Sequence, residues 1–550
     1  MKIKVLKIFA ILILLNFYAC DTTKDSGQAN NSVSPDGIAI KEYPAGRSGK
    51  KISVEESEYD NFDISDKENP NFNTEEYDKI TENEFLAVKQ NPLSTFSIDV
   101  DNASYSNVRR MLNYGEMPDK GAVRTEEMIN YFTYDYPAPS GKHPFSIYTE
   151  ISTSPWNTNH KLVHIGIQGK KLNYNDLKPS NLVFLLDVSG SMSDKNKLPL
   201  LKKSLKLLLN ELSQNDKISI VVYAGAAGLV LPPTNASEKE KIIAALDKLE
   251  AGGSTAGGAG IELAYKTAKD AFIKGGNNRV ILSTDGDFNI GTSSTSSLVD
   301  LIEEKRKDGI YLTILGFGMG NYKDGRMEQI SNAGNGNYFY IDNFKEAEKV
   351  FVKEMRANMF TIAKDVKIQI EFNPAQVKAY RLIGYENRML KKEDFNNDKK
   401  DAGELGAGHT VTALYEIIPA NSDEETGGNV DSLKYQKNSV TDRAKNSNEI
   451  MTIKFRYKPP ESDKSILITH SLTSKYPLGT TITEIENPSN NFLFSAAVAE
   501  FGMLLRDSEF KGEASYDNVL KLAKSSKGKD ENGYRHEFIG LVETAKSLSK

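Results

Sequence analysis

The sequence predicts an α/β protein built on a doubly wound, mostly parallel sheet, flanked by a β-sandwich and a small C-terminal helical region. Three observations support this fold class. Residues 178–358 alternate short apolar segments with segments of helical spacing, as in a parallel sheet covered on both faces. Residues 359–485 alternate apolar and polar side chains, which is typical of half-buried strands. Residues 486–550 return to helical spacing.

The composition is that of a soluble globular protein with several domains. The chain has 550 residues, of which 39% are apolar and 26% are charged, and this length suggests about three or four domains. The 69 Lys and Arg residues against 75 Asp and Glu give a net charge of −6. Such a balance provides no basic field to hold a polyanion, so we expect no nucleic acid among the partners.

Residues 1–20 have the pattern of a lipoprotein signal peptide. Lysines precede an apolar block at 8–15 that is too short to span a membrane as a helix. The single cysteine, Cys20, follows the small Ala19 where such a signal is cut, which resembles a bacterial lipobox and implies a lipid anchor at Cys20. An ordinary cleaved signal with an incidental cysteine is the alternative. The polar and acidic residues 21–84 are predicted to be a disordered tether.

Residues 85–177 are predicted to form an N-terminal α+β extension. Helical spacing is present at 105–112 and 123–132, and period-two alternation follows at 145–147 and 163–167. These alternating segments have the same character as those after residue 358. We therefore expect both parts to contribute strands to one sandwich.

The elements of the α/β domain follow from its hydrophobic pattern. We predict strands at 182–186, 218–223, 228–231, 279–284, 311–315 and 338–341, and helices at 198–212, 238–249, 261–273, 298–307 and 344–355. The sandwich strands are expected around 366–372, 411–417, 451–457 and 466–468, and the C-terminal helices at 492–505, 516–523 and 537–548.

Oxygen-bearing side chains gather where two predicted strands end. Asp187, Ser189 and Ser191 follow the apolar strand 182–186, and Asp285 follows the strand that ends at residue 284. Thr255 lies in a glycine-rich turn before the helix 261–273. The carboxyl ends of parallel strands meet at one edge of a sheet, where ligands usually bind. Hard cations such as Mg²⁺ take oxygen ligands, so these residues are candidate metal ligands.

The same residues resemble the metal-ion-dependent adhesion site of von Willebrand factor A domains and integrin I domains. The resemblance rests on Asp-x-Ser-x-Ser at 187–191, Thr255 in its Gly-Ser-Thr turn, and Thr284-Asp285-Gly286. It covers about residues 180–355, and the flanking sequences resemble those of bacterial A-domain lipoproteins with their own extensions. The resemblance implies bound Mg²⁺, with Mn²⁺ or Ca²⁺ as alternatives, and a protein ligand that supplies an acidic side chain. It also implies a last helix that shifts when the ligand binds.

Three other interpretations of these residues remain. Serines after a strand often cap the next helix. A serine hydrolase would need a histidine base, but neither Ser189 nor Ser191 lies in Gly-x-Ser-x-Gly, and all 6 histidines fall outside 178–358. A nucleotide site at 316–320 lacks the third glycine of the dinucleotide motif, and no phosphate-binding loop motif is present in the sequence.

The sequence therefore predicts a non-enzymatic, lipid-anchored protein of the cell envelope, with the outer membrane favoured over the inner. We expect no catalytic residues and no nucleotide. The predicted role is metal-dependent binding of a protein ligand, in adhesion or in assembly of an envelope complex. A non-adhesive envelope scaffold with a structural metal is the alternative, and a serine hydrolase is a weaker one.

Overall fold

The computed structural model describes residues 74–173, 177–254, 257–286, 288, 295–425, 435, 439–473 and 488–550. The chain divides into a unit at Met1–Ser48 and a unit at Gly49–Lys550, and every described residue belongs to the second. The predicted signal peptide, its Cys20 and Thr255 lie outside the described residues. In the part of the chain that is described, no helix has both the length and the apolar character needed to cross a membrane.

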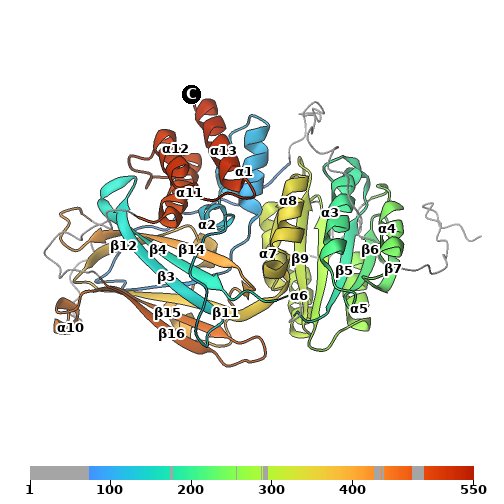
Figure 1. The fold of residues 1–550 in the computed structure, drawn as a ribbon, viewed down its shortest axis with the longest axis horizontal. Coiled ribbons are helices and arrows are strands. Elements are labelled where there is room, and N and C mark those ends of the chain that lie inside the picture. Colours follow the sequence, from blue (N-terminus) through green and yellow to red (C-terminus); the bar gives the residue numbers. More distant parts are fainter. Residues whose placement is uncertain are drawn as a thin grey trace, which may run out of the picture. The chain divides into compact units, whose positions relative to one another are not determined.

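The centre of the α/β domain is a six-stranded sheet with strand order β10-β9-β8-β5-β6-β7 (Figure 1). All neighbouring pairs are parallel except β6 and β7, which confirms the predicted doubly wound, mostly parallel sheet. Its strands are β5 (Ser180–Asp187), β6 (Lys217–Tyr223), β7 (Ala227–Asn235), β8 (Asn277–Thr284), β9 (Ile310–Phe317) and β10 (Tyr338–Ile341).

Helices cover both faces of this sheet because the side chains of each strand alternate between two cores. Leu182, Phe184 and Leu186 of β5 pack with α3, α4 and α8, whereas Val183 and Leu185 pack with α5, α6 and α7. The helices are α3 (Leu198–Glu211), α4 (Lys239–Asp247), α5 (Gly257–Asp270), α6 (Thr295–Lys307), α7 (Asp324–Ala333), α8 (Phe344–Glu348) and α9 (Met355–Met359).

Two further sheets pack face to face around a common core. One has the order β1-β12-β14-β4-β3, with β1 (Leu86–Ala87), β3 (Phe145–Ser154), β4 (Asn157–Gly169), β12 (Val377–Ile383) and β14 (Thr410–Pro419). The other joins β2 (Leu93–Ser97), β11 (Thr361–Phe372), β13 (Leu405–Gly406), β15 (Glu449–Lys458) and β16 (Ile466–Thr473). Strand β4 pairs with β14, so strands from before and after the α/β domain share one sheet. The α/β domain is thus an insertion into the sandwich.

The C-terminal helices share a core with the helices that precede the α/β domain. They are α11 (Asn490–Arg506), α12 (Tyr516–Ser525) and α13 (Tyr534–Leu548), and they pack with α1 (Ala103–Asn113), α2 (Thr125–Asn130) and the outer face of the β14-β4 sheet. Figure 1 shows α11 to α13 beside α1 and above that sheet. Strand β4 therefore separates two cores, and His164 faces the helices whereas Val163 and Ile165 face the sandwich, as the alternation predicts.

The predicted tether extends too far toward the folded body. Residues 74–84, assigned to it from their polar composition, lie against the folded body: the Thr74 amide donates to the Gly320 carbonyl of the α/β domain at 2.7 Å, and the Asn83 side-chain amide donates to the Leu382 carbonyl of the sandwich at 3.2 Å. Glu75 forms a buried ion pair with Arg110, with Oε2 and Nη2 at 2.8 Å. Pairing between backbone groups far apart in sequence orders a segment that has few apolar residues of its own.

The prediction of one continuous helix at 344–355 is also wrong, because the structure has three successive segments there. Helix α8 ends at Glu348, a π-helical turn follows at Lys349–Lys353, and α9 begins at Met355. The Lys349 ammonium lies 4.1 Å from the centre of the Tyr131 ring. Hydrophobic periodicity cannot predict this buried contact with a residue far away in the sequence. Helix α7 and strand β12 were not predicted, because neither has a clear helical or alternating pattern.

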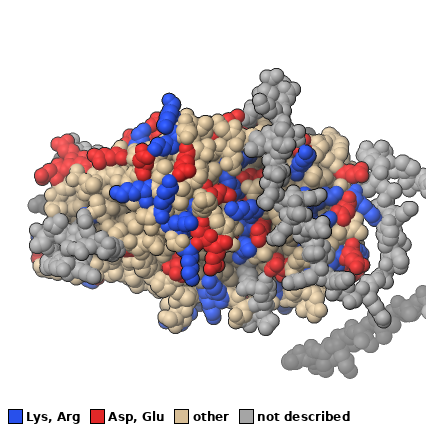
Figure 2. Space-filling model, turned by 45° about the horizontal axis from the view of Figure 1, so that its top comes forward, with Lys and Arg blue, Asp and Glu red and all other residues tan. Residues whose placement is uncertain are grey.

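Charged side chains of both signs are interspersed on the face of the molecule in Figure 2, among the residues that are coloured there. This distribution agrees with the net charge of −6 and offers no large basic area on that face.

Candidate metal centre

Asp187 is the last residue of β5, in the interior of the six-stranded sheet between β6 and β8. Its side chain is fully buried. Oδ1 accepts a hydrogen bond from the Ser189 amide at 2.8 Å, whereas Oδ2 is buried with no hydrogen-bond partner among the described residues. Burial raises the pKa of the Asp187 carboxyl to about 6, against opposing interactions with Ser189 and with the nearby Tyr223 hydroxyl, and the Asp285 carboxylate adds to the rise. The carboxylate thus has an oxygen available to a cation.

The loop after Asp187 turns sharply and places two hydroxyls together. A single 3₁₀ turn at Gly190–Ser193 follows Ser189, and the hydroxyl oxygens of Ser189 and Ser191 lie 2.9 Å apart. The glycine-rich turn holds this loop from the other side, because the Gly190 amide donates to the Gly253 carbonyl at 3.1 Å. The loop and the turn that precedes Thr255 in sequence are therefore neighbours, while the place of Thr255 itself stays a prediction.

These hydroxyls do not cap a helix in the structure. The 3₁₀ turn that begins after Ser189 has no side-chain cap, and Lys197, the residue that precedes α3, supplies none either. The capping interpretation of the serines is therefore wrong, and their oxygens remain available as ligands.

Asp285 reaches the same edge from the neighbouring strand. Strands β5 and β8 are parallel, with Leu186 opposite Ser283, so the residues that follow each strand emerge side by side. Asp285 is fully buried. Gly286 has a φ of +101°, and a Cβ there would lie 2.7 Å from the Tyr322 Cα, so the close turn after Asp285 requires glycine.

A lysine that the sequence analysis missed approaches this site. The Lys197 ammonium lies 3.4 Å from Oδ2 of Asp285 and 3.5 Å from Oδ2 of Asp194, and its side chain is only 6% exposed. It comes from the start of α3, where a lysine has no distinctive sequence signal. The edge therefore holds two buried carboxylates and two adjacent hydroxyls, a ligand set that fits an oxygen-liganded divalent cation, beside one ammonium that offers no ligand.

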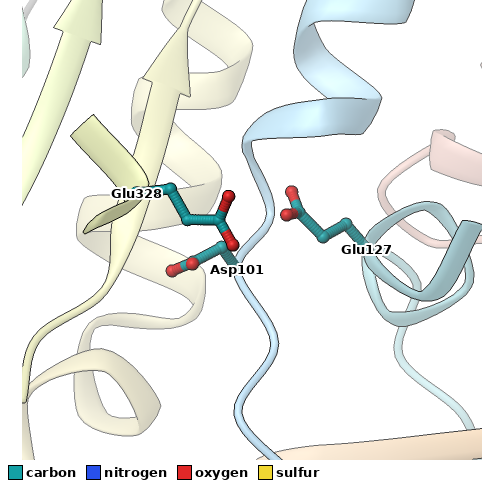
Figure 3. Close-up of side chains that lie close together, drawn as sticks. All are labelled: Asp101, Glu127 and Glu328. Carbon is teal, nitrogen blue, oxygen red and sulfur yellow. The ribbon is translucent and has the colours of Figure 1, made fainter. Parts of the chain in front are cut away.

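A second group of carboxylates does not offer free ligands. Asp101, Glu127 and Glu328 converge from the segment before α1, from α2 and from α7 (Figure 3). Arg388 Nη2 lies 2.9 Å from Oδ2 of Asp101, and Arg124 Nη2 lies 2.9 Å from Oε2 of Glu328. Arg124 Nη1 is 3.7 Å from Oε1 of Glu127. Guanidinium groups thus take the place of a cation, and the cluster is a buried ion-pair network joining the α/β domain to the rest of the chain.

The histidines serve the sandwich and the helices rather than the serine loop. His164 lies in the core, where Nε2 bonds the Tyr136 hydroxyl at 2.7 Å and Nδ1 bonds the Ser495 hydroxyl at 3.0 Å. His160 pairs with Glu416, with Nδ1 and Oε1 at 2.7 Å. No histidine among the described residues forms a hydrogen bond to Ser189 or Ser191. The geometry gives no support to a Ser-His pair.

The sheet topology and the loop after β5 define a von Willebrand factor type A domain. In agreement, residues 181–353 match the family model described as von Willebrand factor type A domain, and residues 71–164 match one described as von Willebrand factor.

The chain as a whole belongs to the YfbK family. It is 44% identical over 483 residues to "Uncharacterized protein YfbK" of Escherichia coli (strain K12), covering 86% of this chain and 82% of that protein. Residues 357–548 match the family model for the C-terminal part of YfbK. The family therefore includes the sandwich and the C-terminal helices as well as the A domain.

More distant similarities cover less of the chain or have lower identity. The magnesium-chelatase 67 kDa subunit of Chlorobaculum tepidum is 26% identical over 232 residues, which is 37% of each chain. The solved structure of a von Willebrand factor type A protein from Catenulispora acidiphila covers 75% of this chain and 98% of its own, at 14% identity and a TM-score of 0.41.

The burial of His164 predicts a pH dependence of stability. Burial lowers its pKa from 6.5 to about 3, so below pH 6.5 the unfolded chain binds a proton that the folded chain does not. Stability should therefore fall as the pH decreases from about 6.5 toward 3. When the pH falls from about 7 to 4.5, the free energy of unfolding should decrease by roughly 2–3 kcal/mol less in His164→Gln than in the wild type. Urea denaturation at both pH values measures this difference, and equal losses would contradict it.

Proposed function

We propose that the edge of the sheet at Asp187 binds a divalent cation, Mg²⁺ in the first place, and through it a protein ligand that supplies an acidic side chain. The residues that would hold the cation are Asp187, Ser189, Ser191 and Asp285, with Thr255 added by the sequence pattern. The observation that carries the proposal is the buried Oδ2 of Asp187, which has no hydrogen-bond partner among the described residues. Leaving such an oxygen unpaired is unfavourable, and a cation would satisfy it.

The charges at the site also favour a divalent cation with an open position. The Asp187 and Asp285 carboxylates carry a double negative charge that the Lys197 ammonium offsets only in part, and serine hydroxyls add neutral oxygens. When bound, the cation would supply a Lewis-acidic position that a carboxylate from another molecule can fill. The exposed position of Ser191 places this edge within reach of a partner.

We further propose that the protein is held in the cell envelope by a lipid on Cys20, with the outer membrane favoured over the inner. The lysine-rich, apolar start of the sequence and the position of Cys20 support this proposal. Membrane fractionation of wild type and Cys20→Ala tests it. The wild type should sediment with membranes and the variant should not, and equal membrane association of both would contradict the anchor.

Removal of the central carboxylate should abolish partner capture without unfolding the protein. We expect wild-type protein to capture a partner from envelope extracts in Mg²⁺ and to lose it in EDTA. Asp187→Ala should capture nothing under either condition, because the cation loses its most buried ligand. Asp270→Ala is a matched control, since this carboxylate is 61% exposed and pairs on the surface with Lys266.

Thermal melting of the same proteins distinguishes a metal that binds the protein ligand from a metal that only stabilises the fold. A Mg²⁺-dependent rise in the melting temperature of the wild type, with unchanged partners in EDTA, would favour the non-adhesive scaffold. Metal-insensitive capture by Asp187→Ala would overturn the proposed function. A hydrolase would instead show turnover of an ester or peptide that Ser189→Ala abolishes.

Lys197 should weaken metal binding, because its ammonium lies close to Asp285 and would repel the metal ion bound there. Lys197→Met should raise the affinity for Mg²⁺ by about tenfold or more, since one such like charge contributes at least about 1.4 kcal/mol of repulsion at partly buried distances. Isothermal titration calorimetry measures the change.

Lys202→Met on the same helix is the control for the Lys197 measurement. The Lys202 ammonium donates to the carbonyls of Asp247 and Leu249, both at 3.0 Å, so its removal should leave Mg²⁺ affinity unchanged. A lower affinity in Lys197→Met would mean that Lys197 supports the site geometry rather than competing with the metal.

A further inference from the structure

A polar cavity lies between the α/β domain and the sandwich, near the opposite end of β8 from Asp285. Its volume is about 260 Å³. The residues that matter for its chemistry are Arg279 near the start of β8, Asn332 and Asn335 at the end of α7, and Glu404 beside β13. The cavity is independent of the proposed metal centre, because no candidate ligand lines it.

Arg279 is the one buried arginine of the described residues without a carboxylate partner. The others are Arg109, Arg110, Arg124, Arg381 and Arg506, and each forms an ion pair at 3.1 Å or less. Arg279 is 3% exposed, and its Nη1 donates to the Thr313 hydroxyl at 2.6 Å. Its Nε is buried with no hydrogen-bond partner. Burial lowers the pKa of Arg279, and the more distant Glu404 offsets this only in part, so an anion in contact with the guanidinium would stabilise it.

The same cavity presents one acceptor that lacks a donor, and a buried carboxyl. Oδ1 of Asn332 is buried without a hydrogen-bond partner among the described residues. Oε1 of Glu404 accepts a hydrogen bond from the Asn335 side-chain amide at 3.0 Å. The Glu404 carboxyl forms no ion pair with Arg279 among the described residues, although the two groups attract each other at longer range. Burial raises the pKa of the Glu404 carboxyl to about 7, against opposing hydrogen bonds from Thr361 and Asn335 and the attraction of Arg279. A guanidinium and a carboxyl therefore line one cavity without forming a direct ion pair with each other.

We propose that this cavity binds a small molecule that carries both a carboxylate and an amino group, such as a free amino acid. The carboxylate would pair with the Arg279 guanidinium, which matches it in a bidentate manner. The amino group would donate to Oδ1 of Asn332 and to the Glu404 carboxylate. A zwitterion satisfies these groups and adds no net charge. A simple anion would leave Asn332 unsatisfied and be repelled by Glu404.

The size of the cavity limits the ligand to a small one. About 260 Å³ is at or below the lower end of the volumes typical of sites for drug-sized ligands. Such a space suits a compact amino acid. The polar lining favours a ligand in which the two charged groups make up most of the ligand's surface.

The experiment is calorimetric titration of the full chain with a matched set of probes. Glycine, L-alanine, D-alanine and L-glutamate test the amino-acid class, propionate lacks the amino group of alanine, and ethylamine lacks its carboxylate. We expect at least one amino acid to bind at least about tenfold more tightly than propionate and ethylamine. Failure of all four amino acids, or equal binding of propionate, would overturn the proposal.

Two variants test whether the amino acid binds in this cavity. Arg279→Gln removes the unpaired charge and should melt at the wild-type temperature or above it, while losing amino-acid affinity by at least about tenfold. Asn332→Ala removes the acceptor of the amino group, so it should weaken the binding of alanine more than the binding of propionate. Asp187→Ala should bind the amino acid as the wild type does, so failure of the metal proposal leaves this result unaffected. Unchanged affinity in both Arg279→Gln and Asn332→Ala would contradict the assignment.

Discussion

The parallel pairing of β5 with β8 brings two buried carboxylates to one edge of the sheet, and the candidate metal centre depends on it. Every residue of β5 is buried, as is every residue of β8 after Asn277, so the strand ends are fixed in position, and Asp187 and Asp285 cannot move away from each other without disrupting the sheet. Like charges so close in a buried setting require compensation. The Lys197 ammonium supplies part of it, and an oxygen-liganded cation would supply the rest.

The A domain is connected to the rest of the chain by buried ion pairs, while its apolar cores are separate from that of the sandwich. Arg124 of the N-terminal part pairs with Asp324 of α7 at 2.6 Å, and Arg109 of α1 pairs with Glu346 of α8 at 2.7 Å. Arg109 also pairs with Glu537 of α13 at 3.0 Å. Helix α8 is therefore bound to both ends of the chain that lie outside the A domain. Any shift of this helix on ligand binding would have to break or carry these ion pairs, which couples it to the C-terminal helices.

The sequence was sufficient for features encoded by local pattern. The apolar run before Asp187, and the strand before Asp285, indicated both strand ends and their common edge, because hydrophobic periodicity reports burial directly. Features made by pairing between distant segments were missed. Lys197 is an ordinary lysine at a helix start, Arg279 is one polar residue in a strand, and the network of Arg124 and Arg388 joins residues far apart in the chain. No local signal distinguishes such residues from exposed ones.

The central claim is that the edge of the sheet at Asp187 holds a divalent cation, and diffraction from crystals soaked in Mn²⁺ tests it most directly. The account predicts an anomalous difference peak bounded by Asp187, Ser189, Ser191 and Asp285, which disappears when excess Mg²⁺ is added. Absence of a peak at this edge would contradict the account. So would a peak confined to Asp101, Glu127 and Glu328, because it would place the cation where guanidinium groups already neutralise the carboxylates.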